Sequence, residues 1–106
     1  MPKCLFKVSY TAEGARGVAK EGGSSRRDTI AKLAENSGGT MESFYFAFGE
    51  TDAYVVCDLP DNATAAAVAL AVNSSGAAQV TTVVLVTPEE VDEATKKEIG
   101  YRAPGA

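Results

Sequence analysis

The chain has 106 residues, the size of a single domain with a hydrophobic core, and we expect one domain over residues 1–106. Its 45% hydrophobic content is typical of globular proteins, and its net charge of −4 argues against nucleic acid as a partner. Histidine is absent, which excludes Ser-His-Asp and Cys-His nucleophile pairs, imidazole-based zinc sites and His-ligated haem. We therefore expect no metal and no cofactor.

The sequence also predicts a cytoplasmic protein that does not enter a membrane. No segment approaches the ~18 consecutive apolar residues that a transmembrane helix needs. The first residues, Met1 to Phe6, lack the basic region, apolar stretch and cleavage site of a secretory signal. A bacterial-type cytosolic protein is the simplest interpretation. In it we expect Cys4 and Cys57 to be buried free thiols, with redox switching as the alternative.

The first part of the chain is predicted to hold a strand and two helices. Polar and apolar residues alternate from Lys3 to Tyr10, which indicates a strand. Thr11 is placed to cap a short helix, and Gly22-Gly23 breaks it. A longer helix is expected to begin with Ser25 as its N-cap and to stop at Gly38-Gly39.

The second part is predicted to hold three more strands and two more helices. The strands are Thr40 to Phe48, Asp52 to Leu59 and Gln79 to Val86. A tight turn at Gly49-Glu50-Thr51 joins the first two of these strands, and an Ala-rich helix from Ala63 to Ser75 precedes the last. Thr87-Pro88-Glu89-Glu90 then begins a C-terminal helix with a capping box.

The order β-α-β-β-α-β plus a C-terminal helix predicts an α+β, ferredoxin-like fold, an antiparallel sheet with two helices on one face. In that topology the third strand lies between the first and the second. We expect Lys7 to oppose Tyr54, which also places Lys3 opposite Asp58 and Cys4 opposite Cys57. Across the turn, we expect Phe48 to oppose Asp52 and Phe46 to oppose Tyr54.

This pairing predicts two different sheet faces. The helix-covered face would carry Tyr45, Ala47, Val55 and Cys57, while Phe44, Phe46, Phe48 and Tyr54 would lie on the open face. Burying one Phe is worth roughly 1.5–3 kcal/mol, so three exposed in a row would favour aggregation. We therefore expect a second copy to pack sheet against sheet as a homodimer or higher oligomer, with a pocket in the gap.

Four sequence motifs resemble those of a known family. They are K-C-L-F-K-V-S-Y-T-x-E-G, S-R-R, L-x-x-x-x-G-G-x-x-x-S-F-Y-F-A-F-G and D-A-Y-V-V-x-D-L-P-D. Together they resemble the GYD domain family over about nine-tenths of the chain. The naming tripeptide is not literal here, because Gly49-Glu50-Thr51-Asp52 stands in its place. The resemblance implies a dimeric α+β barrel and carries no activity with it.

One candidate site is the polar group on the predicted open face. Lys7 and Tyr54, with Asp52, are candidate catalytic residues, since a Lys–Tyr pair in a pocket can act as general acid and base at carbon. Ser9 and the three Phe side chains would line the same pocket. The alternative is an interface ion pair that fixes how two copies pack.

A second candidate is an arginine in the first turn of the long helix, where a cation opposes the helix dipole. Arg26, or else Arg27, could bind a ligand carboxylate or phosphate. A salt bridge to Glu21 or to another subunit is the competing explanation.

Three functions remain open from the sequence. The first is an oligomeric protein that binds a small hydrophobic or acidic ligand between the sheet and its partner. The second is a cofactor-independent isomerase or monooxygenase that uses Lys7 and Tyr54. The third is a structural oligomerisation module, and no choice between enzyme and binding protein follows from the residues alone.

Overall fold

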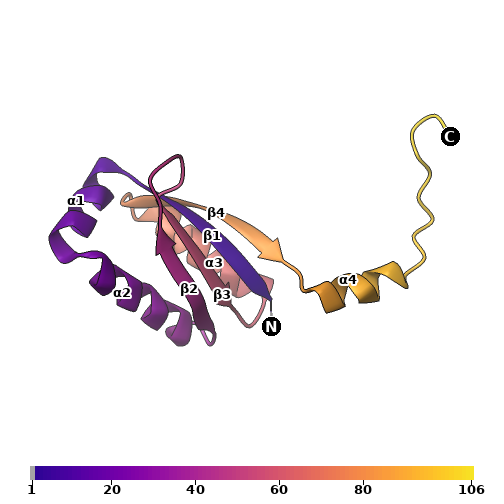
Figure 1. Cartoon of the computed structure of the whole chain (residues 1–106), viewed down its shortest axis with the longest axis horizontal. Helices are drawn as coiled ribbons and strands as arrows, with labels where there is room; N and C mark the ends of the chain where they lie inside the picture. Colours follow the sequence, from indigo (N-terminus) through magenta and orange to yellow (C-terminus); the bar gives the residue numbers. More distant parts are fainter. Residues whose placement is uncertain (1) are drawn as a thin grey trace.

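The computed structural model describes residues 2–106 and contains four strands and four helices. In chain order they are β1 (Lys3–Tyr10), α1 (Ala12–Glu21), α2 (Gly23–Asn36), β2 (Thr40–Phe46), β3 (Ala53–Asp58), α3 (Asn62–Ser74), β4 (Ala78–Leu85) and α4 (Pro88–Thr95). The strands form one antiparallel sheet in the order β2-β3-β1-β4 (Figure 1). The predicted α+β, ferredoxin-like arrangement is confirmed, with β3 between β1 and β2.

Two helices cover different parts of one sheet face. α2 packs along β2, and α3 packs along β4, which leaves the centre of that face between them. α3 can lie close to the sheet because alanine is its commonest residue, and Ala65 is buried there. The core consists of strand residues that point at the helices together with a few helix residues: Cys4, Phe6, Ala34, Val55, Cys57, Leu59 and Ala65.

Three helices begin at a side-chain cap, and two of these caps, Thr11 and Thr87, are the predicted ones. The Thr11 and Asp61 side chains accept the N–H groups of Gly14 and Thr64 at the starts of α1 and α3. At the start of α4, Thr87 and Glu90 form a reciprocal capping box. Each bond satisfies a backbone donor that the first helical turn leaves without a partner.

The predicted start of α2 is wrong. The helix begins at Gly23 rather than after Ser25, and no side chain caps it. Gly22 has φ +91°, a left-handed conformation that glycine adopts readily, so one residue turns the chain and the next helix follows at once. The Ser25 hydroxyl instead donates to Glu21 Oε1 at 3.3 Å.

The register between the two central strands is confirmed. Lys3 opposes Asp58, Cys4 opposes Cys57 and Lys7 opposes Tyr54. Lys3 also forms ion pairs with Asp58 and Glu42, so opposite charges do meet at this end of the open face. Apolar residues at every second position of both strands made this pairing predictable.

The predicted register between β2 and β3 is wrong by one residue. Their loop holds four residues, 48–51, rather than three, because Ala47 N–H donates to the Asp52 carbonyl at 2.8 Å. Phe44 therefore opposes Val55, and Tyr45 opposes Tyr54. A one-residue shift moves every side chain of a strand to the other face.

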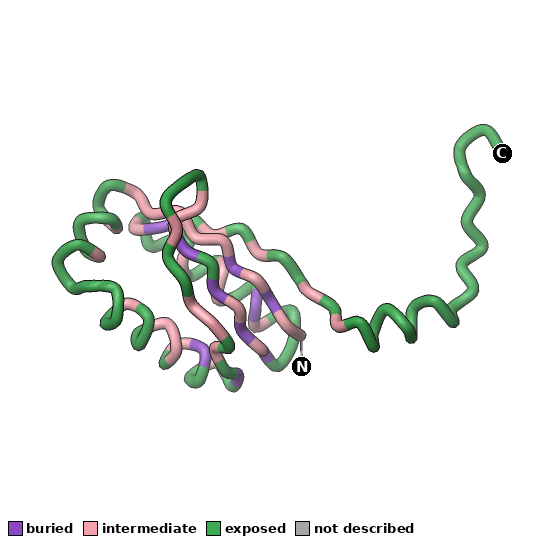
Figure 2. Tube along the Cα trace, viewed as in Figure 1, coloured by how far each residue is buried: buried purple, intermediate pink, exposed green. Residues whose placement is uncertain are grey.

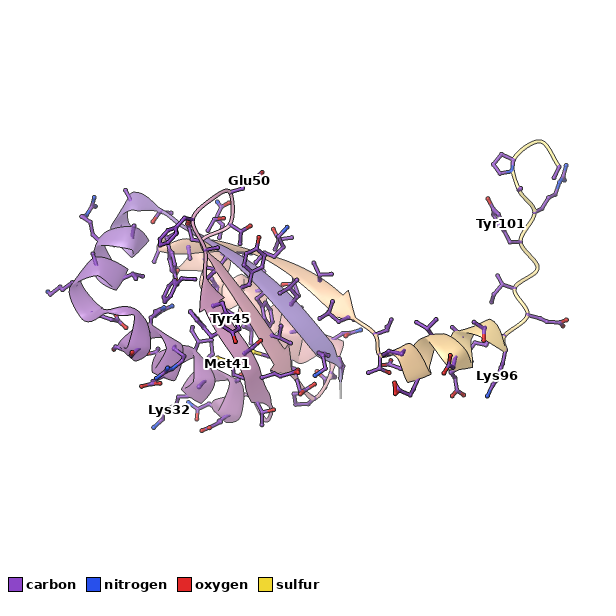
Figure 3. The ribbon with its side chains drawn as sticks, viewed as in Figure 1. Lys32, Met41, Tyr45, Glu50, Lys96 and Tyr101 are labelled. Carbon is purple, nitrogen blue, oxygen red and sulfur yellow. The ribbon has the colours of Figure 1, made fainter. Side chains whose placement is uncertain are left out.

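The shift exchanges the β2 side chains that were predicted for the two faces of the sheet. Phe44 and Phe46 now lie on the helix-covered face, while Tyr45 lies on the open face and is 71% exposed (Figure 3). Phe48 lies in the loop and is fully exposed. A β-bulge at Glu42 shifts the register once more, so that Met41 opposes Cys57.

α4 and the residues after it extend away from the sheet (Figure 1). Figure 2 shows this segment as exposed over almost its whole length, and no residue of α4 is buried. Among the described helices, none is long and apolar enough to cross a membrane.

Candidate functional site

The structure separates the predicted site residues onto two faces of the sheet. Lys7, Ser9 and Tyr54 lie on the open face. The other group, Arg26, Phe44 and Phe46, lies on the helix-covered face or at its edge. Phe44 and Phe46 therefore do not lie beside Lys7 and Tyr54, where the predicted pairing placed them.

The open-face group lines a shallow groove near the β2–β3 loop. Lys7 and Tyr54 are register neighbours there, and the Ser9 hydroxyl donates to the Glu50 carbonyl at 3.1 Å. Tyr54 is 39% exposed, so water reaches this group freely. The structure thus brings Lys7 and Tyr54 together without enclosing them.

Asp52 does not join them. Its Oδ2 accepts the Tyr10 N–H at 2.8 Å, and its own N–H donates to the Val8 carbonyl at 2.8 Å. Both bonds satisfy backbone groups at the end of β1, beyond its pairing with β3. In this arrangement the carboxylate fastens the loop to the central strand.

An apolar space lies on the other face, between α2, α3 and the sheet. It is a cavity of about 50 Å³, and nearly every residue around it is apolar. Its lining includes residues that were not singled out from the sequence as site residues, among them Tyr10 on β1, Ile30 and Leu33 on α2, and Val68 and Val72 on α3. The cavity forms because α2 and α3 cover opposite halves of the sheet face and leave its centre between them.

Arg26 is the charged residue of this cavity. It is half-buried, and its guanidinium forms no ion pair or hydrogen bond with any side chain in residues 2–106. The neighbouring Arg27 is exposed, and its Nε lies 3.1 Å from Asp28 Oδ1. Of the two arginines, the structure thus places only Arg26 on the cavity.

A second, open groove of about 390 Å³ continues from the cavity toward the surface. It shares Tyr10, Arg26, Val72 and Ala78 with the cavity, so these residues mark the junction. Glu13 and Glu21 line the outer groove, but neither carboxylate is within ion-pair distance of Arg26. The site is apolar inside, cationic at the junction and acidic at its rim.

Two phenylalanines position the start of α2. The Phe44 and Phe46 rings meet edge to face with centroids 5.0 Å apart. A Cβ on Gly23 would lie 3.0 Å from the Phe46 ring, so a glycine lets the helix approach the ring closely. Two of the three predicted ligand-binding aromatics thus lie under the helix that carries Arg26, and Phe44 also lines the cavity.

A comparison with protein families gives one match, the GYD domain, over residues 4–95. The chain belongs to the GYD domain family. Comparisons with curated proteins and with solved structures give no match. The matched region holds the whole sheet, both sides of the cavity and α4, so each of these is part of the GYD domain.

The two thiols of this GYD domain are free and buried. Burial raises the pKa of Cys57 to about 11, and burial also raises the pKa of Cys4. Since the thiolate is the reactive form, both cysteines behave as small apolar core residues. Residues 2–106 contain no group of three His, Cys, Asp or Glu side chains that could hold a metal ion.

Proposed function

We propose that this GYD domain binds a small apolar molecule that carries one acidic group. The apolar part occupies the cavity between α2, α3 and the sheet, and the acid binds Arg26 at the junction. One observation carries the proposal: Arg26, a half-buried residue whose guanidinium has no ion-pair partner in residues 2–106, lies at the open end of an apolar cavity. A ligand carboxylate at this position would give the guanidinium a partner.

The size of the cavity limits what enters it. At about 50 Å³ it is smaller than the ~150 Å³ cavity that holds benzene. It accepts the end of an alkyl or small aryl group, and the rest of the ligand lies in the outer groove. Each buried methylene contributes roughly 0.8 kcal/mol to binding.

The charges favour a single negative charge on the ligand. A guanidinium binds a carboxylate through two parallel hydrogen bonds, and hydrogen bonds to charged groups are worth about 1.5–3 kcal/mol. Glu13 and Glu21 at the rim repel further negative charge. A monocarboxylate fits this balance better than a phosphate does.

Thermal unfolding in the presence of octanoate or octanol tests the proposal. We expect octanoate to raise Tm more than octanol, by roughly 4–8 °C for each 1 kcal/mol of binding stabilisation. The variant Arg26→Gln should lose the advantage of the acid and keep the response to the alcohol. Arg27→Gln is the matched control, since Arg27 is exposed and off the cavity. Equal shifts for both ligands, or the same loss in both variants, would contradict the proposal.

We propose, as a second function, that the domain associates with itself through the open sheet face. This face exposes 71% of Tyr45, 39% of Tyr54 and 38% of Val83, which is apolar surface on two adjacent cross-strand rows of the sheet. Mass measurement in solution should give a dimer or larger species, and Tyr45→Glu should weaken it. A monomer at high micromolar concentration would refute self-association and leave the ligand proposal intact.

The catalytic alternative has less support. Lys7 and Tyr54 are neighbours, as an acid–base pair requires, but their groove is open to water within one copy of the chain. It stays a hypothesis that depends on a second copy closing the open face.

A further inference from the structure

α4 is a helix that its own sheet does not support. No residue of α4 is buried, and Val91 on it is 48% exposed. The apolar residues on either side of the helix are more exposed still: Val86 at 60%, Ile99 at 77% and Tyr101 at 75%. We refer to residues 86–101 as the C-terminal arm. Figures 1 and 2 show it leaving the sheet beyond β4 with its surface open.

The arm is nevertheless encoded to be helical. Thr87 Oγ1 accepts the Glu90 N–H at 3.1 Å, Glu90 Oε1 accepts the Thr87 N–H at 3.0 Å, and Pro88 occupies the first turn. A helix of 8 residues is too short to persist by itself in water, where about 12–15 residues are needed. The family match reaches residue 95 and so includes α4. The packing that stabilises this helix must therefore come from another surface.

The same capping box directs the arm away from its own sheet. Thr87 has φ −78° and ψ 159°, an extended conformation, so the chain continues outward where β4 ends. Reaching its own open face would require a different backbone conformation at the end of β4. Packing on a second copy of the chain requires no such change in the arm.

The open face offers a matching surface. Val56, Leu5 and Val83 form a cross-strand apolar row, and Tyr45, Tyr54 and Lys7 form the next row. Lys7 has no ion-pair partner in residues 2–106. α4 carries Val91 and Ala94 on one side, with the acidic Glu90 and Asp92 on either side of Val91. Its charge and its apolar stripe therefore both complement these two rows.

We propose that the C-terminal arm of one copy packs across the open sheet face of a second copy, and that the arm of the second copy packs in the same way across the open face of the first. The exchange places Val91 and Ala94 on the row of Leu5, Val56 and Val83, with the acidic side of α4 near Lys7. This inference rests on the proposed self-association and adds the element that performs it.

Hydrogen–deuterium exchange of the full chain at two protein concentrations tests the exchange of arms. We expect the α4 amides to exchange roughly tenfold more slowly at high concentration than at a concentration where the mass is that of a monomer. A dimer whose α4 amides exchange fast would overturn the arm proposal and leave self-association standing. Protection that is equal at both concentrations would show packing on the chain's own sheet, which also overturns it. A monomer at every concentration would refute both proposals.

A pair of variants locates the contact. Val91→Asp should raise the dissociation constant of the dimer roughly tenfold, because it places a carboxylate in an apolar contact. Valine and aspartate have similar helix propensities, so the change does not act through the helix itself. Glu93→Asp, on the far side of the same helix, is the control and should leave the constant unchanged. An unchanged constant for Val91→Asp, or an equal rise in both variants, would contradict the proposal.

Discussion

The two faces of the sheet use the same four strands to build different environments. On the helix-covered face, α2 and α3 leave an apolar cavity with a single cation at its mouth. On the open face, charged and aromatic residues alternate with one aliphatic row, and water reaches the Lys7 groove. One layer of backbone thus separates the proposed ligand site from the proposed self-association surface, and the side on which each β2 residue lies decides which of the two surfaces it belongs to.

The largest expected effect tests how tightly the helix-covered side is closed. A Cβ on Gly14 would lie 1.9 Å from the Ala77 carbonyl oxygen. Any side chain at this position would therefore push α1 away from the segment before β4. We expect Gly14→Ala to lower the free energy of unfolding by about 3 kcal/mol or more. Urea titration measures this change.

Gly17→Ala on the same helix is the matched control. Nothing lies within 4 Å of its Cβ position, so the replacement should stabilise α1 by roughly 0.5–1 kcal/mol through helix propensity. If both variants have the same stability, α1 does not pack closely against Ala77, which would contradict tight packing on the helix-covered side.

The next effect tests the register that divides the two faces. Phe44→Ala should cost about 2–3 kcal/mol, because the ring packs against the core and lines the cavity. Tyr45→Ala should cost less than about 1 kcal/mol at low protein concentration, since Tyr45 is 71% exposed. The register expected from the sequence predicts the reverse order, so urea titration of the two variants decides between them.

The error in that register has a physical cause. The central strands β1 and β3 could be paired from the sequence because, in each, only one of the two alternating sets of residues is consistently apolar. In the segment S-F-Y-F-A-F, which covers the end of β2 and the two residues after it, apolar residues occupy both odd and even positions. The pattern therefore does not indicate which side of the strand faces the helices. The turn then decides, and Gly49-Glu50-Thr51 is compatible with a loop of three or of four residues.

The arginine of the cavity could have been chosen from the sequence. Arg26 lies four residues before Ile30 and shares a helical stripe with Leu33 and Ala34, which both face the sheet. Arg27 lies about 100° away on the helix and reaches solvent. What could not be predicted is the cavity itself, because it depends on how far apart α2 and α3 lie on the sheet.

A smaller effect is the pH dependence of stability that comes from the Cys57 thiol on the helix-covered face. Burial raises the pKa of Cys57 from 9.0 to about 11, so between these pH values the folded chain holds a proton that the unfolded chain has lost. The stability from this group is present below pH 9 and falls as pH rises toward 11. We expect the urea midpoint of the wild type to fall more steeply over this range than that of Cys57→Ala. Parallel curves would show that the thiol is not buried against the helices.

The smallest effect lies on the open face, in the ion pairs of Lys3. Its hydrogen bonds to Glu42 and Asp58 raise its pKa above 10.5, so their stabilisation is present below that pH and is lost as pH rises through the raised value. Solvent and salt screen exposed ion pairs, and Lys3→Gln should therefore reduce the urea midpoint slightly in low salt and less in 1 M salt. Lys32→Gln, at an exposed position of α2, is the control and should show no such dependence on salt. A loss for Lys3→Gln that persists in 1 M salt would mean that this end of the open face is covered, as packing by a second copy would require.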